Sequence, residues 1–469
     1  MLWLVLGCRP AASPEDTTLP ESRTDSPRDS PGDSPRDSPR DSPKDSEALT
    51  PPASRIVWGD LHSHTNLSMD GCEDNAGVGC LPRAALLPAD DWYARARESQ
   101  LDFAAMTDHS EFSVYEDVTS GARMDIWSRT LEVLARPAQG DPLGFAGYEW
   151  TAHCAGAQGL HRTVVLEEPQ PCAAWRVASC PLKEQKAAIG KERYYADSER
   201  PRRDDTSELL EGLAAAPTSD GCEDSRWIAF VHHPAYTIPA DIDWSDPGPL
   251  LAEEALVEVY SEHGSSECVN PAAPYCDWNL ATEVYSPAGS LQAMLQAGHR
   301  PGLLAGTDSH DGRPGSLGDG PGPNSLYDDT DGDGVPDTAQ HHRAPGGLTG
   351  LIVDPDAELD RAAIFDALES KRSVAASSSF EVLRVWVLSS TGTWHAPGEA
   401  LEPGEYRLFV DLEDPDLEDW TWEWMLPDGS ARAAPTELSF APGDVGYLRL
   451  RAQLRGQEHR VWVSPWWAD

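Results

Sequence analysis

Residues 55–65 read Arg-Ile-Val-Trp-Gly-Asp-Leu-His-Ser-His-Thr, an apolar run that leads into two histidines one residue apart. Continuous apolar runs of this length suit strands buried on both faces of a parallel sheet. Their alternation with helix-like segments favours an α/β fold, and periodicity alone leaves open a barrel or a doubly wound sheet. The later apolar runs lie at residues 103–106, 144–148, 163–166, 227–231, 255–260, 302–305 and 347–353.

Histidines and acids gather beside these predicted strands. Residues i and i+2 of a strand share one face, so His62 and His64 can approach one ion together, and Asp308 with His310 repeats this spacing. A single histidine is more often an ordinary polar residue than a ligand, but so many at strand ends predict a metal site at one mouth of the fold. His161 is the exception, because it lies at the start of its apolar run, whereas the other candidates lie at or after the end of theirs. The candidates are His62, His64, Asp108, His109, Glu149, His161, His232, His233, His263, Asp308 and His310.

The order of these motifs resembles the PHP superfamily, named for polymerase and histidinol phosphatase domains. The resemblance covers about residues 55–378, and its phrases are also similar to a bacterial PHP-like family known mainly as a domain of unknown function. It implies a distorted (β/α)7 barrel that holds two or three divalent ions. The phrases are WGDLHSHTNLSMDG, FAAMTDHSEF, GYEWT, HRTVVL, VHHPAY, VEVYSEHGSSE and GLLAGTDSHDGRPGS.

Carried over motif by motif, the resemblance implies a ligand set for each ion, and Zn, Mn and Fe all suit such ligands. Asp70 stands where PHP enzymes often have another histidine, which departs from the family pattern at the third ion. The implied sets are His62, His64 and Asp308 for the first ion, Glu149 as the bridge to a second ion on His161 and His233, and His109 with His310 for the third.

Other residues beside these motifs are expected to assist the ions. Asp108 would orient an imidazole, and His232 and His263 would support the ligands or contact substrate. Arg162 and Arg313 are the nearest partners for a phosphate, although arginines on loops are usually just solvated. We therefore expect Asp108, His263 and Arg162 to contribute to catalysis.

The implied activity is hydrolysis of a small-molecule or exported phosphate ester by water activated between two ions. Amidohydrolases also open with H-x-H, but they lack T-D-H and usually end in a lone aspartate, so the D-x-H ending favours PHP. Two alternatives stay open. The same ions could hydrolyse a non-phosphate ester or amide, or the protein could be a non-catalytic cell-surface binder.

The pattern changes after residue 378. Alternating strands separated by Pro, Gly and Asp turns predict a small antiparallel β-sandwich over residues 379–469. Trp420, Trp422 and Trp424 share one face of a predicted strand. They suit buried core better than a sugar-stacking platform.

An insert at about residues 314–346 carries a second type of ion motif. It offers carboxylates at alternate positions and the carbonyl of Val335 at position 7, with Gly334 where calcium loops turn sharply. Gln340 replaces the usual bidentate Glu, so we expect a structural calcium loop, or else a flexible acidic segment. The carboxylate ligands would be Asp329, Asp331, Asp333 and Asp337.

The N-terminal region predicts export. Residues 1–8 end in Val-Leu-Gly-Cys, which resembles a lipobox with Cys8 as the lipidated residue, although the apolar stretch is short. Either the true start lies upstream or the match is accidental. Residues 9–54 contain a repeated Asp-Ser-Pro-Arg unit that predicts a disordered spacer. The expected location is the periplasm or cell surface of a bacterium, with the membrane reached only through the lipid.

The remaining cysteines suit an oxidising compartment. Zinc is the competing interpretation, but no C-x-x-C spacing occurs in the sequence. Three pairs share a separation of eight residues, which predicts three local disulfides and one longer bridge. The predicted pairs are Cys72–Cys80, Cys172–Cys180, Cys268–Cys276 and Cys154–Cys222.

The charge balance argues against two classes of partner. The chain has 79 acidic and 36 basic residues and a formal net charge of −43. Nucleic acids and anionic membranes bind through basic patches, so neither is an expected partner. A small phosphate ester stays possible because bound metal ions invert the local potential.

Overall fold

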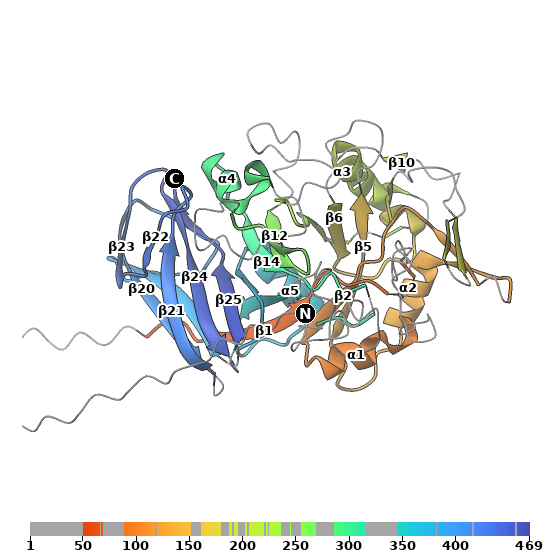
Figure 1. The fold of residues 1–469 in the computed structure, drawn as a ribbon, viewed down its shortest axis with the longest axis horizontal. Coiled ribbons are helices and arrows are strands. Elements are labelled where there is room, and N and C mark those ends of the chain that lie inside the picture. The colour runs from red at the N-terminus through yellow and green to blue at the C-terminus, as the bar shows by residue number, and fades with distance from the viewer. Residues whose placement is uncertain are drawn as a thin grey trace, which may run out of the picture. The chain divides into compact units, whose positions relative to one another are not determined.

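A large mixed β-sheet runs through the computed structural model (Figure 1). In the described part of the chain it has sixteen strands, with parallel and antiparallel neighbours. The fold is therefore mixed α/β. The structure describes residues 50–65, 67–68, 89–117, 120–151, 161–179, 187–189, 192–195, 202–203, 206–219, 222–223, 225–235, 244, 255–268, 286–310, 312–315, 346–380, 382–414, 417–454 and 457–469.

Six strands that lead to the candidate residues point the same way in this sheet. Parallel pairs join β1 to β2, β2 to β5, β11 to β12, and β12 to β14. Most of their residues are buried, as the short apolar runs of a covered parallel sheet require. The strands are β1 (Arg55–Asp60), β2 (Phe103–Met106), β5 (Leu143–Thr151), β11 (Trp227–Val231), β12 (Leu256–Ser261) and β14 (Gly302–Ala305).

Strand β6 (His161–Leu166) runs in the opposite direction between β5 and β11. The connection from β5 is residues 152–160, which is shorter than the dozen or so residues of a helical crossover. The chain therefore turns back beside β5. This reversal pairs His161, the first residue of β6, with Thr151, the last residue of β5.

The expected (β/α)7 barrel is not shown by these elements. Besides β6, the neighbouring strands β15 (Leu348–Val353) and β16 (Ser373–Ala376) pair antiparallel, whereas such a barrel has parallel strands each followed by a helix. The described helices are few and short, and none is long and apolar enough to span a bilayer. They are α1 (Trp92–Glu98), α2 (Ile126–Leu134), α3 (Thr206–Ala215), α4 (Leu291–Gln296) and α5 (Arg361–Glu369), with 3-10 turns at Ala89–Asp91, Ala173–Trp175, Ala216–Thr218 and Pro287–Gly289.

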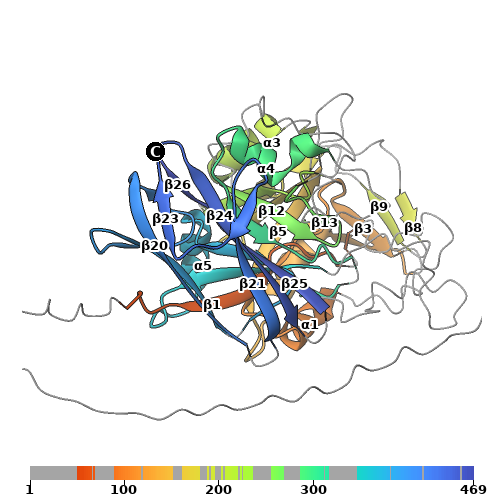
Figure 2. The same cartoon turned by 60° about the vertical axis from the view of Figure 1, so that its left-hand side comes forward.

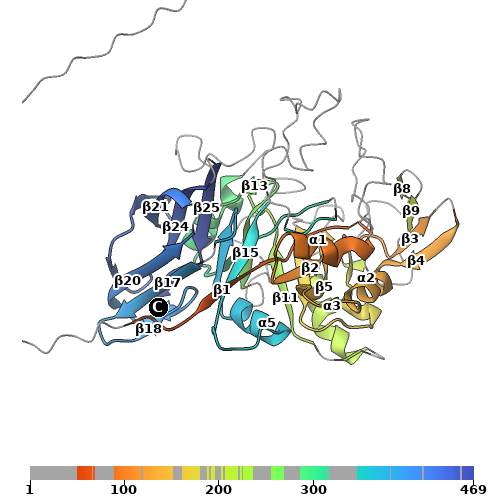
Figure 3. The same ribbon diagram turned by 90° about the horizontal axis from the view of Figure 1, so that it is seen from below.

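Helices α2, α4 and α5 begin at capping side chains and bury one face. The carboxylates of Asp125 and Asp360 accept hydrogen bonds from the first-turn amides of α2 and α5. Helix α5 lies beneath the sheet in Figure 3, and its Ile364 and Phe365 share a hydrophobic cluster with Phe103 of β2. Helix α5 therefore covers one face of β1 and β2, the first two strands that lead to the candidate residues.

The large sheet continues without a break into the C-terminal strands. Val374 of β16 pairs with Val463 of β25, and residues Thr50–Asp469 form one compact unit. A second antiparallel sheet contributes Val385 to the same hydrophobic cluster as Leu448. The C-terminal strands are β17 (Val382–Ser389), β18 (Trp394–His395), β19 (Ala400–Leu401), β20 (Gly404–Glu413), β21 (Leu417–Met425), β22 (Ala431–Ala433), β23 (Glu437–Phe440), β24 (Val445–Leu454), β25 (Gln457–Val463) and β26 (Trp466–Ala468).

The three tryptophans of β21 differ in how deeply they are buried. Trp424 is buried and lies 6.1 Å from Trp466 between ring centroids. Trp422 is half-buried, and Trp420 is 46% exposed. The expectation of a buried core therefore holds for Trp424, holds in part for Trp422 and is wrong for Trp420, because the hydrophobic cluster that contains Trp424 and borders Trp422 does not reach Trp420.

A small antiparallel sheet lies away from the C-terminal strands, where Figure 2 shows β3, β8 and β9 together. Its strands come from before α2 and before α3, so it joins segments far apart in the chain. The remaining short strands are β3 (Val114–Asp117), β4 (Ala122–Asp125), β7 (Ala178–Ser179), β8 (Ala187–Ile189), β9 (Glu192–Tyr195), β10 (Arg202–Arg203) and β13 (Gly264–Ser265).

A disulfide joins Cys172 to Cys222, with 5.0 Å between their Cα atoms and a sequence separation of 50. The predicted pairs Cys172–Cys180 and Cys154–Cys222 are therefore wrong. Equal spacing could not reveal this bridge, because its position depends on how the segment after β6 meets the segment after α3. Cys268 is also disulfide-bonded. Its predicted partner and the pair Cys72–Cys80 lie outside the described residues, as do Cys8 and the calcium loop.

Candidate metal centre

The candidate residues meet at the edge of the sheet where the six parallel strands end. His62 and His64 follow β1, His109 follows β2, and His232 and His233 follow β11. The parallel direction brings these ends together. His161 reaches the same edge for a different reason, since β6 is reversed and starts where β5 ends.

Backbone hydrogen bonds continue between the segments beyond the strand ends. The amide of Asp308 donates to the carbonyl of His62 at 2.8 Å, and the amide of His64 donates to Ser309 at 2.8 Å. Similar bonds join Thr107 to Ser63, Glu149 to Thr107, His232 to His161, and Glu262 to Thr307. These bonds fix the segments relative to one another before any ligand binds.

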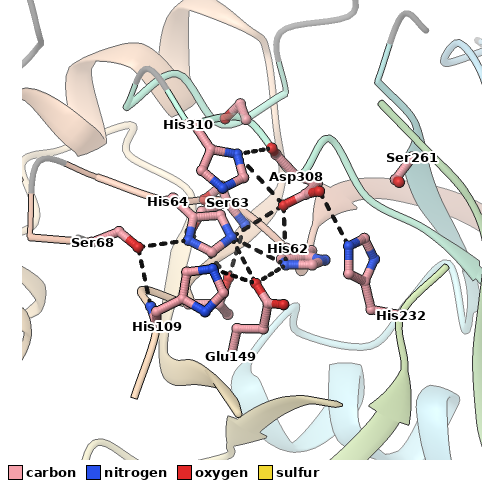
Figure 4. A network of polar contacts seen from close by, with 12 residues as sticks. His62, Ser63, His64, Ser68, His109, Glu149, His232, Ser261, Asp308 and His310 are labelled. Atoms are coloured by element: carbon pink, nitrogen blue, oxygen red, sulfur yellow. Dashed lines mark hydrogen bonds and ion pairs between the residues drawn. The ribbon is translucent and has the colours of Figure 1, made fainter. Parts of the chain in front are cut away.

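Four donor atoms form a compact group (Figure 4). The Nε2 atoms of His62 and His64 are 3.3 Å apart. Glu149 Oε2 lies 3.2 Å from the first and 3.0 Å from the second. Asp308 Oδ1 lies 3.4 Å and 3.1 Å from the same two nitrogens. All four side chains are buried.

This spacing suits a metal ion. Bonds of about 2.0–2.1 Å to a tetrahedral zinc ion place neighbouring donor atoms about 3.3 Å apart. Asp308 adds a second sign, because both oxygens of this buried carboxylate lie 3.1–3.4 Å from imidazole nitrogens without a well-aligned hydrogen bond to them. A buried carboxylate without donors costs several kcal/mol, which a bound cation would offset. His62, His64, Glu149 and Asp308 therefore fit a metal ion, as the implied first set requires.

Glu149 also reaches towards two further histidines. Its Oε1 contacts Nδ1 of His161, and its Oε2 lies 3.6 Å from Nε2 of His109. One donor atom each from His109, Glu149 and His161 fall within 4.8 Å of one another. This is the bridging position that the resemblance implies for Glu149. His233, the other implied ligand, has its ring centroid 5.2 Å from that of His161.

The ring of His310 stacks on the ring of His64, with 4.2 Å between the two ring centroids. His64, His109 and His310 form another group that could hold an ion. These residues include the implied third set. Asp70, the further candidate for that ion, lies outside the described residues.

Asp308 carries a different pair of histidines on its second oxygen. Oδ2 lies 3.1 Å from Nε2 of His232 and 3.2 Å from Nε2 of His263. His232, His233 and His263 together form a three-histidine group. His232 and His263 were expected only to support the ligands or contact substrate, yet each lies as close to Asp308 as His64 does.

Three buried glutamates hold the histidines and were missed by the sequence analysis. Glu258 accepts from Nδ1 of His62 at 3.1 Å and from Nδ1 of His232 at 2.5 Å. Glu111 lies 3.3 Å from Nδ1 of His109, and Glu262 lies 3.2 Å from Nδ1 of His310. Glu258 did leave a signal, because it is an acid inside the apolar strand Leu-Val-Glu-Val-Tyr.

Burial and mutual charge set the ionisation of this cluster. Burial opposes charge on every member, yet Glu258 and Asp308 raise the pKa of His62 well above its usual range. His109 and His161 hold the pKa of Glu149 well below its usual range despite its burial. The centre therefore holds ionised carboxylates among its imidazoles, which is the charge state in which carboxylates bind metal.

His233 differs from its neighbours in charge. Burial, together with His232, His263 and His161, pushes the pKa of His233 well below its usual range. A neutral imidazole is the form that binds metal. Its backbone also takes the left-handed conformation, with φ of 33°, and Asp308 has φ of 53°. Such backbones cost about 1–2 kcal/mol for a residue with a side chain and are often found at functional sites.

Two aspartates hold the loops instead of the ions. Asp108 accepts hydrogen bonds from the amide and hydroxyl of Thr65 at 2.7 Å and 3.0 Å, which fixes the end of the H-x-H segment. The described hydrogen bonds of Asp108 therefore go to the H-x-H segment. The sequence instead predicted a hydrogen bond to an imidazole. Asp60 accepts from the hydroxyl and amide of Thr307 and from the amides of His62 and Gly315.

The predicted phosphate partners are placed differently from the ligands. Arg162 pairs across the sheet with Trp150 and Val231, so it lies on the face of β6 opposite to His161. Strand alternation therefore starts the side chains of Arg162 and His161 on opposite faces of β6, and a contribution of Arg162 to catalysis stays a prediction. Arg313 is half-buried in the loop after β14, where its carbonyl accepts from the hydroxyl of Ser309.

Comparison with known proteins adds no relative. Family models, curated proteins and solved structures were all compared with the chain, and none of them matches it. The chemistry of the centre therefore rests on its own donor atoms, which are imidazole nitrogens and carboxylate oxygens. Such a set suits Zn, Mn or Fe and does not choose between them.

Proposed function

We propose that this protein is a metal-dependent hydrolase, with phosphate esters as its substrate class. The observation that carries the proposal is the buried group formed by His62, His64, Glu149 and Asp308. The two histidine Nε2 atoms lie 3.0–3.4 Å from each other and from one oxygen of each carboxylate. Divalent ions bound there would supply positive charge for the substrate and lower the pKa of a water molecule.

The chain's own residues would do three things in this reaction. His62 and His64 hold the ion with Nε2, since Nδ1 of His62 already donates to Glu258 and Nδ1 of His64 is 3.1 Å from Ser68 Oγ. Glu149 and Asp308 supply negative charge at fixed positions. The buried surroundings exclude bulk water and strengthen each of these electrostatic interactions.

We further propose kinship with the PHP superfamily, and the preference for phosphate rests on that kinship. The order of motifs from H-x-H to D-x-H supports it, together with the gathering of these motifs at one edge of a mixed sheet. The finer proposal of a strongly distorted barrel is supported by the backbone bonds that join Asp308 and Ser309 to His62 and His64. Export and Cys8 lipidation stay proposals from the sequence.

The test combines metal analysis with a substrate panel. The full chain is assayed for bound metal and for turnover of p-nitrophenyl phosphate, bis-p-nitrophenyl phosphate and p-nitrophenyl acetate. We expect His62→Asn with Asp308→Asn to lose metal and at least about 1,000-fold in activity, because several kcal/mol of charge stabilisation goes with the ion. His395→Asn is the matched control, a histidine beside a carboxylate on β18.

The same panel separates the alternatives. One observation is compatible with hydrolysis of another ester or an amide, namely that Arg162 starts from the face of β6 opposite to His161. Turnover of the acetate ester alone would support that alternative. Metal-free protein without turnover would contradict the hydrolase and favour a binding protein.

A further inference from the structure

The two oxygens of Asp308 face different sets of histidines. Oδ1 belongs to the group with His62 and His64 described above. Oδ2 faces Nε2 of His232 at 3.1 Å and Nε2 of His263 at 3.2 Å. The resemblance gave Asp308 one ion and gave neither His232 nor His263 a place as a ligand.

The contact between His232 and Asp308 cannot be an ordinary hydrogen bond of a neutral histidine. Nδ1 of His232 lies 2.5 Å from Glu258 Oε1, and a carboxylate can only accept, so the imidazole hydrogen is on Nδ1. Nε2 then presents a lone pair to an oxygen that also presents lone pairs. Asp308 Oδ2 belongs to a buried side chain and lies 3.1 Å from this nitrogen. A cation between the two atoms removes the conflict. A second proton on His232 is the competing occupant, because Glu258 and Asp308 raise the pKa of this imidazole despite its burial.

His263 is placed by a tight hairpin. Ser261 of β12 pairs with Gly264 of β13, so Glu262 and His263 form the turn between them. Glu262 points inwards and is tied through its amide to the carbonyl of Thr307. This fixes His263 next to Asp308, which follows Thr307 directly. The position is built by backbone pairing and does not depend on the side chain alone.

Exposure differs between the two sides of Asp308. His62 and His64 are completely buried, whereas His263 is 22% exposed. An ion on the Oδ2 side would therefore lie nearer to solvent than an ion on the Oδ1 side. It is the better placed of the two to meet a substrate.

We propose that His232, His263 and Oδ2 of Asp308 bind a further divalent ion, which makes Asp308 a bridging carboxylate. His233 lies at the edge of this position, with its ring centroid 4.8 Å from that of His263. The oxygen–nitrogen distances again match the edge of about 3.3 Å that a tetrahedral zinc site requires. This inference rests on the proposed function, because it adds an ion to the same centre.

The test counts ions instead of turnover. The full chain is stripped with a chelator, reloaded with zinc, and measured by calorimetric titration and by elemental analysis. The variants are His263→Gln, His232→Gln and both together, with His395→Gln as the control outside the centre. Circular dichroism checks that each variant is folded, and His263 on its partly exposed turn is the safer of the two substitutions.

We expect the double variant to bind one ion fewer per chain than the wild type, and the control to bind the full number. Unchanged zinc number and affinity in all three variants would overturn the inference, since a proton would then join His232 to Asp308. Failure of the proposed function looks different, because the wild type itself would then bind no zinc. The combination His62→Asn with His64→Asn should remove the Oδ1 ion independently.

Discussion

Glu258 shows how one residue can fix two ligands. Its carboxylate accepts from Nδ1 of both His62 and His232, which leaves Nε2 of each histidine free to face the centre. A glutamine has one acceptor oxygen, so it can hold only one of these imidazoles and presents an N–H group to the other. We therefore expect Glu258→Gln to weaken zinc binding by about 10–100-fold, the usual loss when such a supporting partner is removed.

Competition with a chromophoric chelator measures this affinity. Glu399→Gln is the matched control, since Glu399 accepts from Nδ1 of His395 on a half-exposed pair far along the chain. The control should keep the wild-type affinity. Equal affinity in Glu258→Gln would mean that the histidines are oriented by packing alone.

Asp60 predicts a pH effect on stability. Burial raises its pKa to about 6, in spite of hydrogen bonds from Thr307, Gly315 and His62 that lower it. A raised pKa means that the folded protein binds the proton more tightly than the unfolded chain. The contribution of Asp60 is therefore fully present below about pH 4 and is lost as pH rises through about 6. The loss amounts to about 3 kcal/mol, at about 1.4 kcal/mol per pKa unit.

Asp60→Asn removes this titration, because an amide does not ionise in this range. The measurement is the difference in unfolding free energy between variant and wild type, taken by denaturant titration with chelator present at pH 4 and pH 7. We expect this difference to move in favour of the variant by up to about 3 kcal/mol between the two pH values. A difference that stays flat would show that Asp60 titrates alike in both states.

At the scale of elements, the loop after β14 leaves no space for a larger residue at Gly306. A Cβ atom built there would lie 2.7 Å from Glu258 Oε2 and 2.7 Å from the Cβ of His62. We expect Gly306→Ala to cost about 1–3 kcal/mol, the usual range for overpacking. It should also weaken zinc binding, because either Glu258 or His62 must move.

Gly404 of β20 provides the control for that substitution. Its nearest atoms to an added Cβ are 4.0 Å away, so an alanine fits there without displacement. Thermal unfolding and zinc titration of both variants give the comparison. Zinc binding by Gly306→Ala that equals that of Gly404→Ala would contradict the tight placement of the loop.

The sequence could predict the segments of the centre but not every direction or partner. Histidines and acids beside short apolar runs were enough to select His62, His64 and Asp308, because the periodicity of a strand can be read from neighbouring residues alone. The direction of β6 depends on pairing with β5 and β11, so its effect on His161 and Arg162 could not be read from spacing. Glu258 and the Cys172–Cys222 bridge likewise depend on contacts between distant segments.

At the scale of the whole molecule, the centre and the C-terminal strands are joined by a buried polar network. Glu267 follows the hairpin that carries His263 and accepts from Tyr447 at 2.6 Å and from Arg449 at 2.9 Å. Arg449 also pairs with Glu423 at 2.7 Å. Both Glu267 and Arg449 are buried, so this network ties β21 and β24 to the site-bearing loop.

The network and the shared sheet predict that the centre and the C-terminal strands unfold together. Removing one partner of a buried ion pair leaves the other charge uncompensated and costs about 3–5 kcal/mol. We therefore expect Arg449→Met to lower the unfolding free energy by that amount. Arg451 lies on the same strand, β24, and forms a half-exposed pair with Glu458 of β25, so Arg451→Met should cost at most about 1 kcal/mol. Calorimetry with zinc bound should show one transition for both variants, because β16 pairs with β25 across the junction. Two separate transitions, with only the later one shifted by zinc, would instead mean that the C-terminal strands form an independent domain.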